Sequence, residues 1–173
     1  EPVLLLAHPD RDLLEKARRA VELDVERLPA VLSMDASSDV IQSCQVEKGD
    51  VDAAWEQAHL IVEGEYRTGA QEHLYIEPNG VLAVATPQDG VTVWGSMQCP
   101  YYVHKALARL FGLPNDKVRV IQCETGGGFG GKEDYPSIIA GHAALLALKS
   151  GRPVKMIYDR AEDMAATTKR HPS

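Results

Sequence analysis

The sequence is poor in cysteine, which narrows the classes of protein to which it can belong. It has three cysteines in 173 residues, Cys44, Cys99 and Cys123, and no two of them form a C-x-x-C pair. This number and spacing do not fit a disulfide framework and do not by themselves make an iron–sulfur or zinc site. We therefore expect three buried thiols in a reducing cytoplasm, and no metal ligand from the chain.

Long apolar runs and basic patches are missing as well. No apolar run is long enough to span a bilayer. Acidic and proline residues bracket Leu4–Ala7, so this short run is not the core of a signal peptide. The net charge of −7 argues against nucleic acid and anionic membranes as partners. The composition predicts a cytoplasmic globular protein, and the start at Glu1 indicates a part of a longer one.

The hydrophobic pattern predicts an α+β fold (mixed α/β), in which helices pack on mixed sheets. We expect a β-α-β unit and a linker in residues 1–45, with a second part in residues 46–173. The predicted strands are Val3–Ala7, Val25–Val31, His59–Arg67, Gly80–Thr86, Val91–Ser96, Lys117–Cys123 and Val154–Tyr158. The predicted helices are Asp10–Leu23 with Asp10 as its N-cap, a short one capped by Asp50 and ending at Gln57, Gln98–Phe111, Ser137–Lys149 and Arg160–Thr167.

The most distinctive stretch is the glycine-rich loop Thr125–Glu133, between a predicted strand and a predicted helix. Five of the six residues from Gly126 to Gly131 are glycine, and Phe129 is the sixth. Such a cluster is tolerated where the backbone takes unusual angles or approaches a ligand closely. Free N–H groups before a helix suit an anion or an electron-rich ligand, so we predict a binding loop.

Two phosphate-binding patterns fit this loop in part. The spacing of Gly126–Lys132 is that of a P-loop, but Glu133 stands where a serine or threonine would hold magnesium. The dinucleotide pattern also fits, with Asp159 after the next strand as the ribose-binding acid. Glu133 and Asp134 would then occupy the positive helix end that a pyrophosphate needs. A structural turn with Asp134 as helix cap is the third alternative.

A resemblance to a known family gives a fourth interpretation of the loop. Thr125–Glu133 resembles the cofactor-binding loop of the molybdenum hydroxylases, the xanthine dehydrogenase and aldehyde oxidase family. Gly69–Glu77 is similar to that family's segment with Gln-Glu-His, and Gly151–Val154, Asp159–Met164 and Arg170–Pro172 resemble a third pattern. The order and spacing agree over most of the chain.

The resemblance implies a molybdenum-cofactor-dependent hydroxylase that uses water as its oxygen source and passes electrons through iron–sulfur clusters to FAD. Residues 46–173 would be the first part of the cofactor-binding domain, and residues 1–45 the end of a preceding hammerhead-like domain. The cofactor would be molybdenum-molybdopterin, with the cytosine dinucleotide form as an alternative. The remainder of the molybdenum subunit and the iron–sulfur and FAD domains or subunits would be its partners.

The resemblance also implies roles for individual residues. Gln71 would donate a hydrogen bond to a molybdenum oxo ligand, and the backbone around Phe129 would approach the cofactor. Glu133 would orient the substrate, which favours a purine or another N-heterocycle over an aldehyde. The residues expected to bind the cofactor are Gln71, Gly127, Gly128, Phe129, Gly130 and Gly131.

Other residues are expected to serve the structure. Lys132 is predicted to pair with nearby carboxylates or to close the loop, and Met97–Cys99 form a turn to which we assign no role. The family's general base lies downstream of the part that this chain resembles, so we expect the chain alone to be inactive. A nucleotide-binding module using Gly126–Lys132 for phosphates, and a non-catalytic interaction domain, remain the alternatives.

Overall fold

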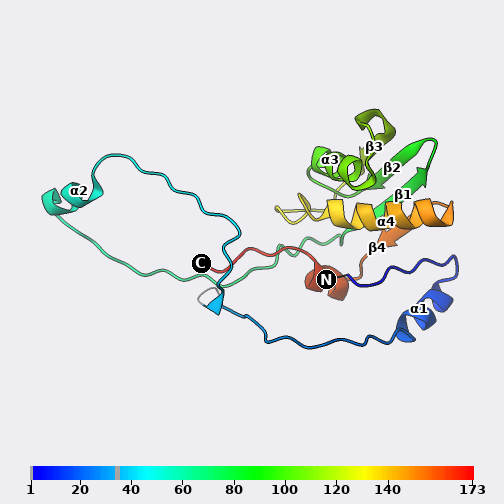
Figure 1. The fold of residues 1–173 in the computed structure, drawn as a ribbon, viewed down its shortest axis with the longest axis horizontal. Helices are drawn as coiled ribbons and strands as arrows, with labels where there is room; N and C mark the ends of the chain where they lie inside the picture. Colours follow the sequence, from blue (N-terminus) through cyan, green and yellow to red (C-terminus); the bar gives the residue numbers. More distant parts are fainter. Residues whose placement is uncertain (1, 34–35) are drawn as a thin grey trace. The chain divides into compact units, whose positions relative to one another are not determined.

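The structure, a computed structural model, describes residues 2–33 and 36–173 (Figure 1). The chain divides into two compact units. The first combines the residues up to Ala20 with Arg67–Ser173, and the second is Val21–Tyr66.

The first unit is built on a mixed four-stranded sheet in the order β3-β2-β1-β4. Strands β1 (Gly80–Thr86) and β2 (Gly90–Gly95) form an antiparallel hairpin, as the turn pattern between them predicts. Strand β4 (Val154–Ile157) pairs antiparallel with β1, and β3 (Val118–Gln122) pairs parallel with β2. All four strands lie within a residue or two of their predicted bounds, which confirms the mixed α/β class.

Two helices, α3 (Pro100–Phe111) and α4 (Pro136–Ser150), contact the sheet and each other. Figure 1 shows α4 beside β1 and β4, and α4 contacts both strands. In β1, burial alternates, because successive side chains of a strand point to opposite faces. The hydrophobic core forms between these side chains and the small residues of α4, which allow a close approach. Its members include Val81, Ala83, Ala85, Val93, Leu107, Ile139, Ala140, Ala143 and Ala147.

Two of the three predicted helix caps are confirmed. Asp10 and Asp50 accept hydrogen bonds from amides in the first turns of α1 (Arg11–Arg19) and α2 (Val51–Gln57). Asp134 does not cap α4: the capping position is Tyr135, whose side chain makes no cap bond, and a proline follows. The other elements are α5 (Arg160–Ala166) and the 3₁₀ helix η2 (Asn115–Lys117).

Three predicted strands are wrong. Val3–Ala7, Val25–Val31 and His59–Arg67 form no strand in the described residues, and the helix predicted to reach Leu23 ends at Arg19. Their apolar side chains are exposed, as in Val62, which is 83% exposed. A strand requires a neighbouring strand for its backbone groups, and the sheet that the described residues form contains none of these segments.

The prediction of buried thiols is also wrong. Cys44 and Cys123 are exposed, and Cys99 is partly exposed. Cys44 lies in the second unit, whose described residues are nearly all exposed, and Cys123 directly follows the end of β3. All three cysteines are free. None of the helices that the structure describes has the length and apolarity needed to cross a membrane.

Candidate functional site

The fold brings the three motif segments of the sequence together. The carboxylate of Glu77, in the segment before β1, accepts a hydrogen bond of 2.8 Å from the main-chain N–H of Gly126, the first glycine of the loop. Arg160 of α5 donates from one nitrogen to the carbonyls of Tyr75 and Ile76, at 2.6 and 2.7 Å. Segments that are 49 to 85 positions apart in the sequence thus share one site.

Three glycines of the loop lie against side chains that leave no room for a Cβ atom. A Cβ at Gly126 would lie 2.7 Å from Cβ of Glu77, and one at Gly131 would lie 2.6 Å from Cε1 of Tyr75. At Gly128 it would overlap the carboxamide of Gln98. Close packing therefore requires glycine at these three positions.

Backbone conformation accounts for two further glycines. Gly127 and Gly130 have φ values of +95° and +90°, in the region that glycine adopts without steric cost. Phe129, between them, also has a positive φ of +52°, which is uncommon for a residue with a side chain. Its ring is 75% exposed, so it does not pack in the core. The loop holds an aromatic side chain at the surface in a strained conformation.

Gln98, in the turn that follows β2, holds the loop, although its residue type and position alone predicted no role for it. Its Oε1 accepts hydrogen bonds from the main-chain N–H groups of Gly130, at 3.0 Å, and Lys132, at 3.1 Å. Its own main-chain N–H donates to the carbonyl of Lys132 at 2.7 Å. Its Nε2 makes no hydrogen bond with any residue that the structure describes, and the residue is exposed.

The sequence did contain a signal for Gln98. Strands β2 and β3 are parallel neighbours, so their carboxyl ends meet at the same edge of the sheet. A polar residue shortly after β2 is then expected beside the loop that follows β3. The turn Met97–Cys99 was located correctly, but the parallel pairing that gives it meaning was not predicted.

Lys132 closes the loop by pairing with a carboxylate, as predicted. The residue is completely buried, and its Nζ lies 2.8 Å from Oε2 of Glu77 and 2.9 Å from Oγ of Ser96. It also lies 4.7 Å from the ring centre of Tyr75, in a cation–π contact. Burial alone would raise the pKa of Glu77, but hydrogen bonds from Lys132 and Ser96 outweigh it and lower the pKa.

These contacts weigh against both phosphate-binding alternatives. A P-loop lysine must reach a phosphate, whereas Lys132 is buried and paired inside the protein. The acid proposed for a ribose, Asp159, instead caps α5 by accepting from the N–H of Glu162 at 2.8 Å.

A buried network fixes the segment before β1. Asp163 of α5 is fully buried and accepts from the hydroxyl of Tyr75 at 2.7 Å and from the main-chain N–H of Asn79 at 2.5 Å. Burial, followed by the hydrogen bond to Asp163, raises the pKa of the Tyr75 hydroxyl, so it stays a donor. The network fixes the same segment whose Glu77 reaches the loop.

Gln71 lies at the start of this segment. Its main chain pairs with Arg170 through two hydrogen bonds of 3.1 and 3.0 Å, and no hydrogen bond joins it to the loop among the described residues. Two positions later the ring of His73 lies next to Gly131, with its Cγ 2.9 Å from where a Cβ would stand. The role expected for Gln71 stays a prediction.

The predicted binding residues differ in how many of their N–H groups are free. The N–H of Gly130 donates to Gln98, and that of Gly131 to the carbonyl of Gly128. Those of Gly127, Gly128 and Phe129 have no hydrogen-bond partner within residues 2–33 and 36–173. Three consecutive amides are thus unpaired, on a residue that is half-buried (Gly127), one that is buried (Gly128) and one that is exposed (Phe129). Glu133, the predicted substrate residue, is exposed and directly follows Lys132.

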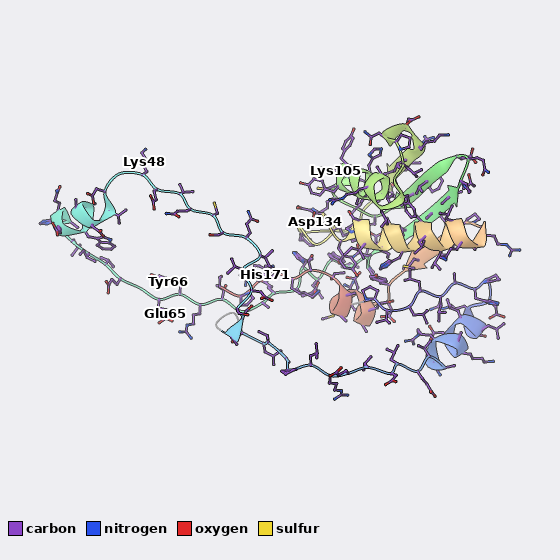
Figure 2. All side chains as sticks on the ribbon, viewed as in Figure 1. Lys48, Glu65, Tyr66, Lys105, Asp134 and His171 are labelled. Carbon is purple, nitrogen blue, oxygen red and sulfur yellow. The ribbon has the colours of Figure 1, made fainter. Side chains whose placement is uncertain are left out.

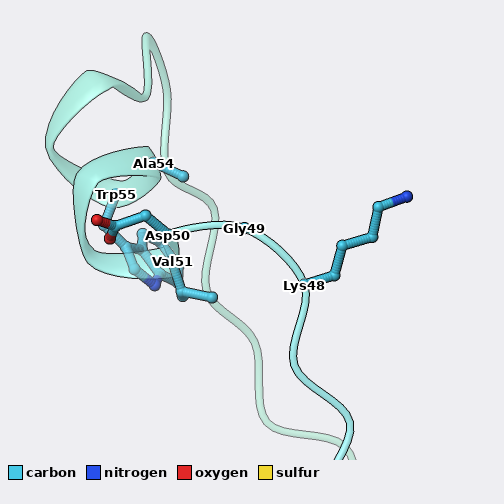
Figure 3. Close-up of a pocket in the computed structure, with 6 residues that line it drawn as sticks. All are labelled: Lys48, Gly49, Asp50, Val51, Ala54 and Trp55. Carbon is cyan, nitrogen blue, oxygen red and sulfur yellow. The ribbon is translucent and has the colours of Figure 1, made fainter.

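The described residues offer few other places for chemistry. They contain no group of three or more His, Cys, Asp or Glu side chains that could hold a metal ion. In the second unit, Lys48–Val51, Ala54 and Trp55 line an open pocket of about 470 Å³ (Figure 3). None of the three motif segments contributes a residue to this pocket.

The sequence was compared with protein families and with known proteins. Residues 33–173 match the family described as the molybdopterin cofactor-binding domain. The chain is 34% identical to the nicotinate dehydrogenase large molybdopterin subunit of Eubacterium barkeri, over 99% of this chain and 43% of that subunit. It is 38% identical to a xanthine dehydrogenase of Blastobotrys adeninivorans, over 94% of this chain and 12% of that enzyme.

Solved structures share the fold. The aldehyde oxidoreductase of Desulfovibrio gigas superimposes with a TM-score of 0.75 at 22% identity, over 94% of this chain and 19% of that one. Quinoline 2-oxidoreductase of Pseudomonas putida 86 gives a TM-score of 0.73, also at 22% identity, over 92% of this chain and 22% of that one. The chain therefore spans less than half the length of each of these relatives.

Proposed function

Because this chain belongs to the molybdopterin cofactor-binding domain family, we propose that its glycine loop forms one wall of the cofactor site in a hydroxylase of the xanthine dehydrogenase and aldehyde oxidase type. The observation that carries the proposal is the row of three unpartnered N–H groups at Gly127, Gly128 and Phe129. Such a row suits an electron-rich oxo, dithiolene or phosphate group.

Internal packing fixes the position of the loop. Gly126, Gly128 and Gly131 lie against side chains with no space for a Cβ, so a larger residue at any of these positions would displace the loop or its neighbours. Gln98 adds a neutral donor: its Oε1 is held by two loop amides, which leaves Nε2 for a ligand. A neutral amide donates without adding a charge beside the metal. We propose that Gln98, rather than Gln71, provides this hydrogen bond.

The bound cofactor would supply the hydroxylation chemistry, with water as the oxygen source. The chain's own residues would bind and orient. The exposed carboxylate of Glu133 would accept a hydrogen bond from a ring N–H, and the exposed ring of Phe129 would give an aromatic substrate an apolar surface. We propose a purine or related N-heterocycle as substrate, with aldehydes second. Relatives named for nicotinate and xanthine support that order.

The same proposal covers the rest of the enzyme. Iron–sulfur clusters and FAD would be carried by other domains or subunits, and the remainder of the molybdenum subunit would complete the site. A cytoplasmic location is supported by three free cysteines. Since the chain spans 12% of the xanthine dehydrogenase relative, we expect no turnover from these residues alone.

Replacing Gln98 tests the cofactor contact in the protein that contains this chain. We expect Gln98→Met to lower the oxidation rate about 100-fold, the cost of one hydrogen bond aimed at a reacting centre. Gln88→Met, in the exposed hairpin turn, is the matched control, and Gln71→Met compares the two glutamines. Molybdenum and pterin are measured in each purified protein. Wild-type protein free of both would end the proposal, and a larger loss with Gln71→Met would return the role to Gln71.

Glu133 tests the substrate class. We expect Glu133→Val to lower the rate with purines and N-heterocycles by at least tenfold relative to the rate with aldehydes, because the ring loses its acceptor. The measurement is the ratio of kcat/KM values for the two substrate classes. Asp134→Val, one residue further along and also exposed, should leave that ratio unchanged. Equal ratios in wild type and Glu133→Val would show that Glu133 does not face the substrate.

A further inference from the structure

Both ends of the glycine loop converge on one atom. Oε2 of Glu77 accepts from the main-chain N–H of Gly126 at 2.8 Å, where the loop begins. The same oxygen accepts from Nζ of Lys132 at 2.8 Å, where the loop ends. A third bond of 2.6 Å comes from the hydroxyl of Ser96, just after β2. One carboxylate oxygen therefore links the first and last parts of the loop.

The surroundings of this oxygen are shaped for the contact. The main-chain N–H of Glu77 donates to the carbonyl of Gly126 at 3.3 Å, so the two residues bond in both directions. Any side chain at Gly126 would collide with Cβ of Glu77. Lys132 is fully buried, while the side chain of Glu77 is 42% exposed. The carboxylate thus neutralises a cation behind the loop, and loss of either partner would change the charge there.

We propose that Glu77 is a positioning residue that holds the glycine loop closed and thereby fixes the spacing of the free amides from Gly127 to Phe129. It acts through the loop and touches no reacting group. The ligand that benefits is the molybdenum cofactor, and this part rests on the function proposed above. Gln98 fixes the far side of the loop through Gly130 and Lys132, so the middle residues are left to face a ligand.

The chain contains a matched control for this role. Glu72 lies in the same segment and pairs with Lys169 at 2.7 Å, with its side chain 15% exposed. It accepts a bond from the N–H of Leu74 and none from the loop among the described residues. Glu72→Gln therefore removes an ion pair of similar geometry without releasing the loop.

The test uses hydrogen exchange of the loop peptide, the unfolding temperature Tm and the molybdenum content, measured on the protein that contains this chain. The variants are Glu77→Gln, Lys132→Met, the double variant and Glu72→Gln. With Glu77→Gln we expect at least tenfold faster exchange in residues 126–132 and less than a third of the wild-type molybdenum. With Glu72→Gln we expect both values to stay at the wild-type level.

The double variant separates positioning from stability. It contains no unpaired buried charge, so we expect Tm to recover most of what Glu77→Gln loses, while loop exchange stays fast because Lys132 no longer ties its end. Loop exchange that follows Tm in every variant, or that is unchanged by Glu77→Gln, would overturn the proposal. Wild-type protein without molybdenum would overturn the proposed function, and the exchange data would still decide whether Glu77 closes the loop.

Discussion

The two units of this chain treat apolar side chains in opposite ways. In the first unit, Val93 is completely buried in the middle of a four-stranded sheet. In the second unit, Val62 is 83% exposed and Trp55 is 53% exposed, and α2 is the one α-helix formed by its described residues. Figure 2 shows the side chains of Lys48 and Tyr66 in this unit, both on extended stretches of the ribbon. Apolar content alone does not make a core; neighbours on both sides of a segment do.

Backbone hydrogen bonding explains the difference. Val93 is paired with Ala83 on one side and Val120 on the other, so its strand is held along both edges. The extended stretch around Val62 has no neighbouring strand among the residues that the structure describes. An isolated strand gains neither a hydrogen-bonded ladder nor a buried face, and it is not stable by itself in water.

The largest difference in stability between the two units is expected when a buried aspartate and an exposed aspartate are each replaced by alanine. Asp163→Ala leaves the hydroxyl of Tyr75 and the N–H of Asn79 without their acceptor, so we expect a loss of about 4 kcal/mol in the free energy of unfolding. Asp52→Ala, in the exposed first turn of α2, should cost under about 0.5 kcal/mol. Urea unfolding measures both, and similar losses would contradict the contrast.

A matched pair of valines gives the next largest effect. Val93→Ala removes two methyl groups from a packed core, and we expect it to cost about 2 kcal/mol, from lost burial and the cavity left behind. Val62→Ala removes the same atoms from an exposed side chain and should cost under about 0.5 kcal/mol. If Val62→Ala proved as costly as Val93→Ala, the residues around Val62 would have a packing partner.

Lowering the pH is expected to have the smallest effect on the free energy of unfolding. Burial works to raise the pKa of Glu72, but the hydrogen bonds from Lys169 and Leu74 lower it below 4.5. The pKa of Glu77 is also lowered. Such groups stabilise the folded chain above about pH 4.5, and this contribution is lost as the pH falls through their folded pKa values. We expect Glu72→Gln to weaken the fall in the free energy of unfolding between about pH 5 and pH 3. An unchanged slope would contradict the lowered pKa.

Local patterns predicted much of the fold. The strands from Gly80 onward, and the caps Asp10 and Asp50, follow from alternation and turn chemistry that a few neighbouring residues determine. The strand expected at His59–Arg67 shows the same alternation. It could not reveal whether a partner strand exists, because pairing is a property of the fold and not of the segment.

The site was harder to predict for the same reason. The glycine loop and the pairing of Lys132 could be inferred from residue types alone. The part played by Gln98 depends on the parallel pairing of β2 with β3, and that of Glu77 on contacts 19 to 55 positions away. Such convergence is set by topology, which short motifs do not encode.

The pairing of β2 with β3 also determines where the chain can accept an inserted residue. Gln98 follows the end of β2 at Gly95, so one residue inserted between Gly95 and Gln98 would move its carboxamide away from the N–H groups of Gly130 and Lys132. An extra residue in the hairpin turn at Pro87–Asp89 would be absorbed at the surface. Insertions should therefore be tolerated at the turn and rejected between Gly95 and Gln98.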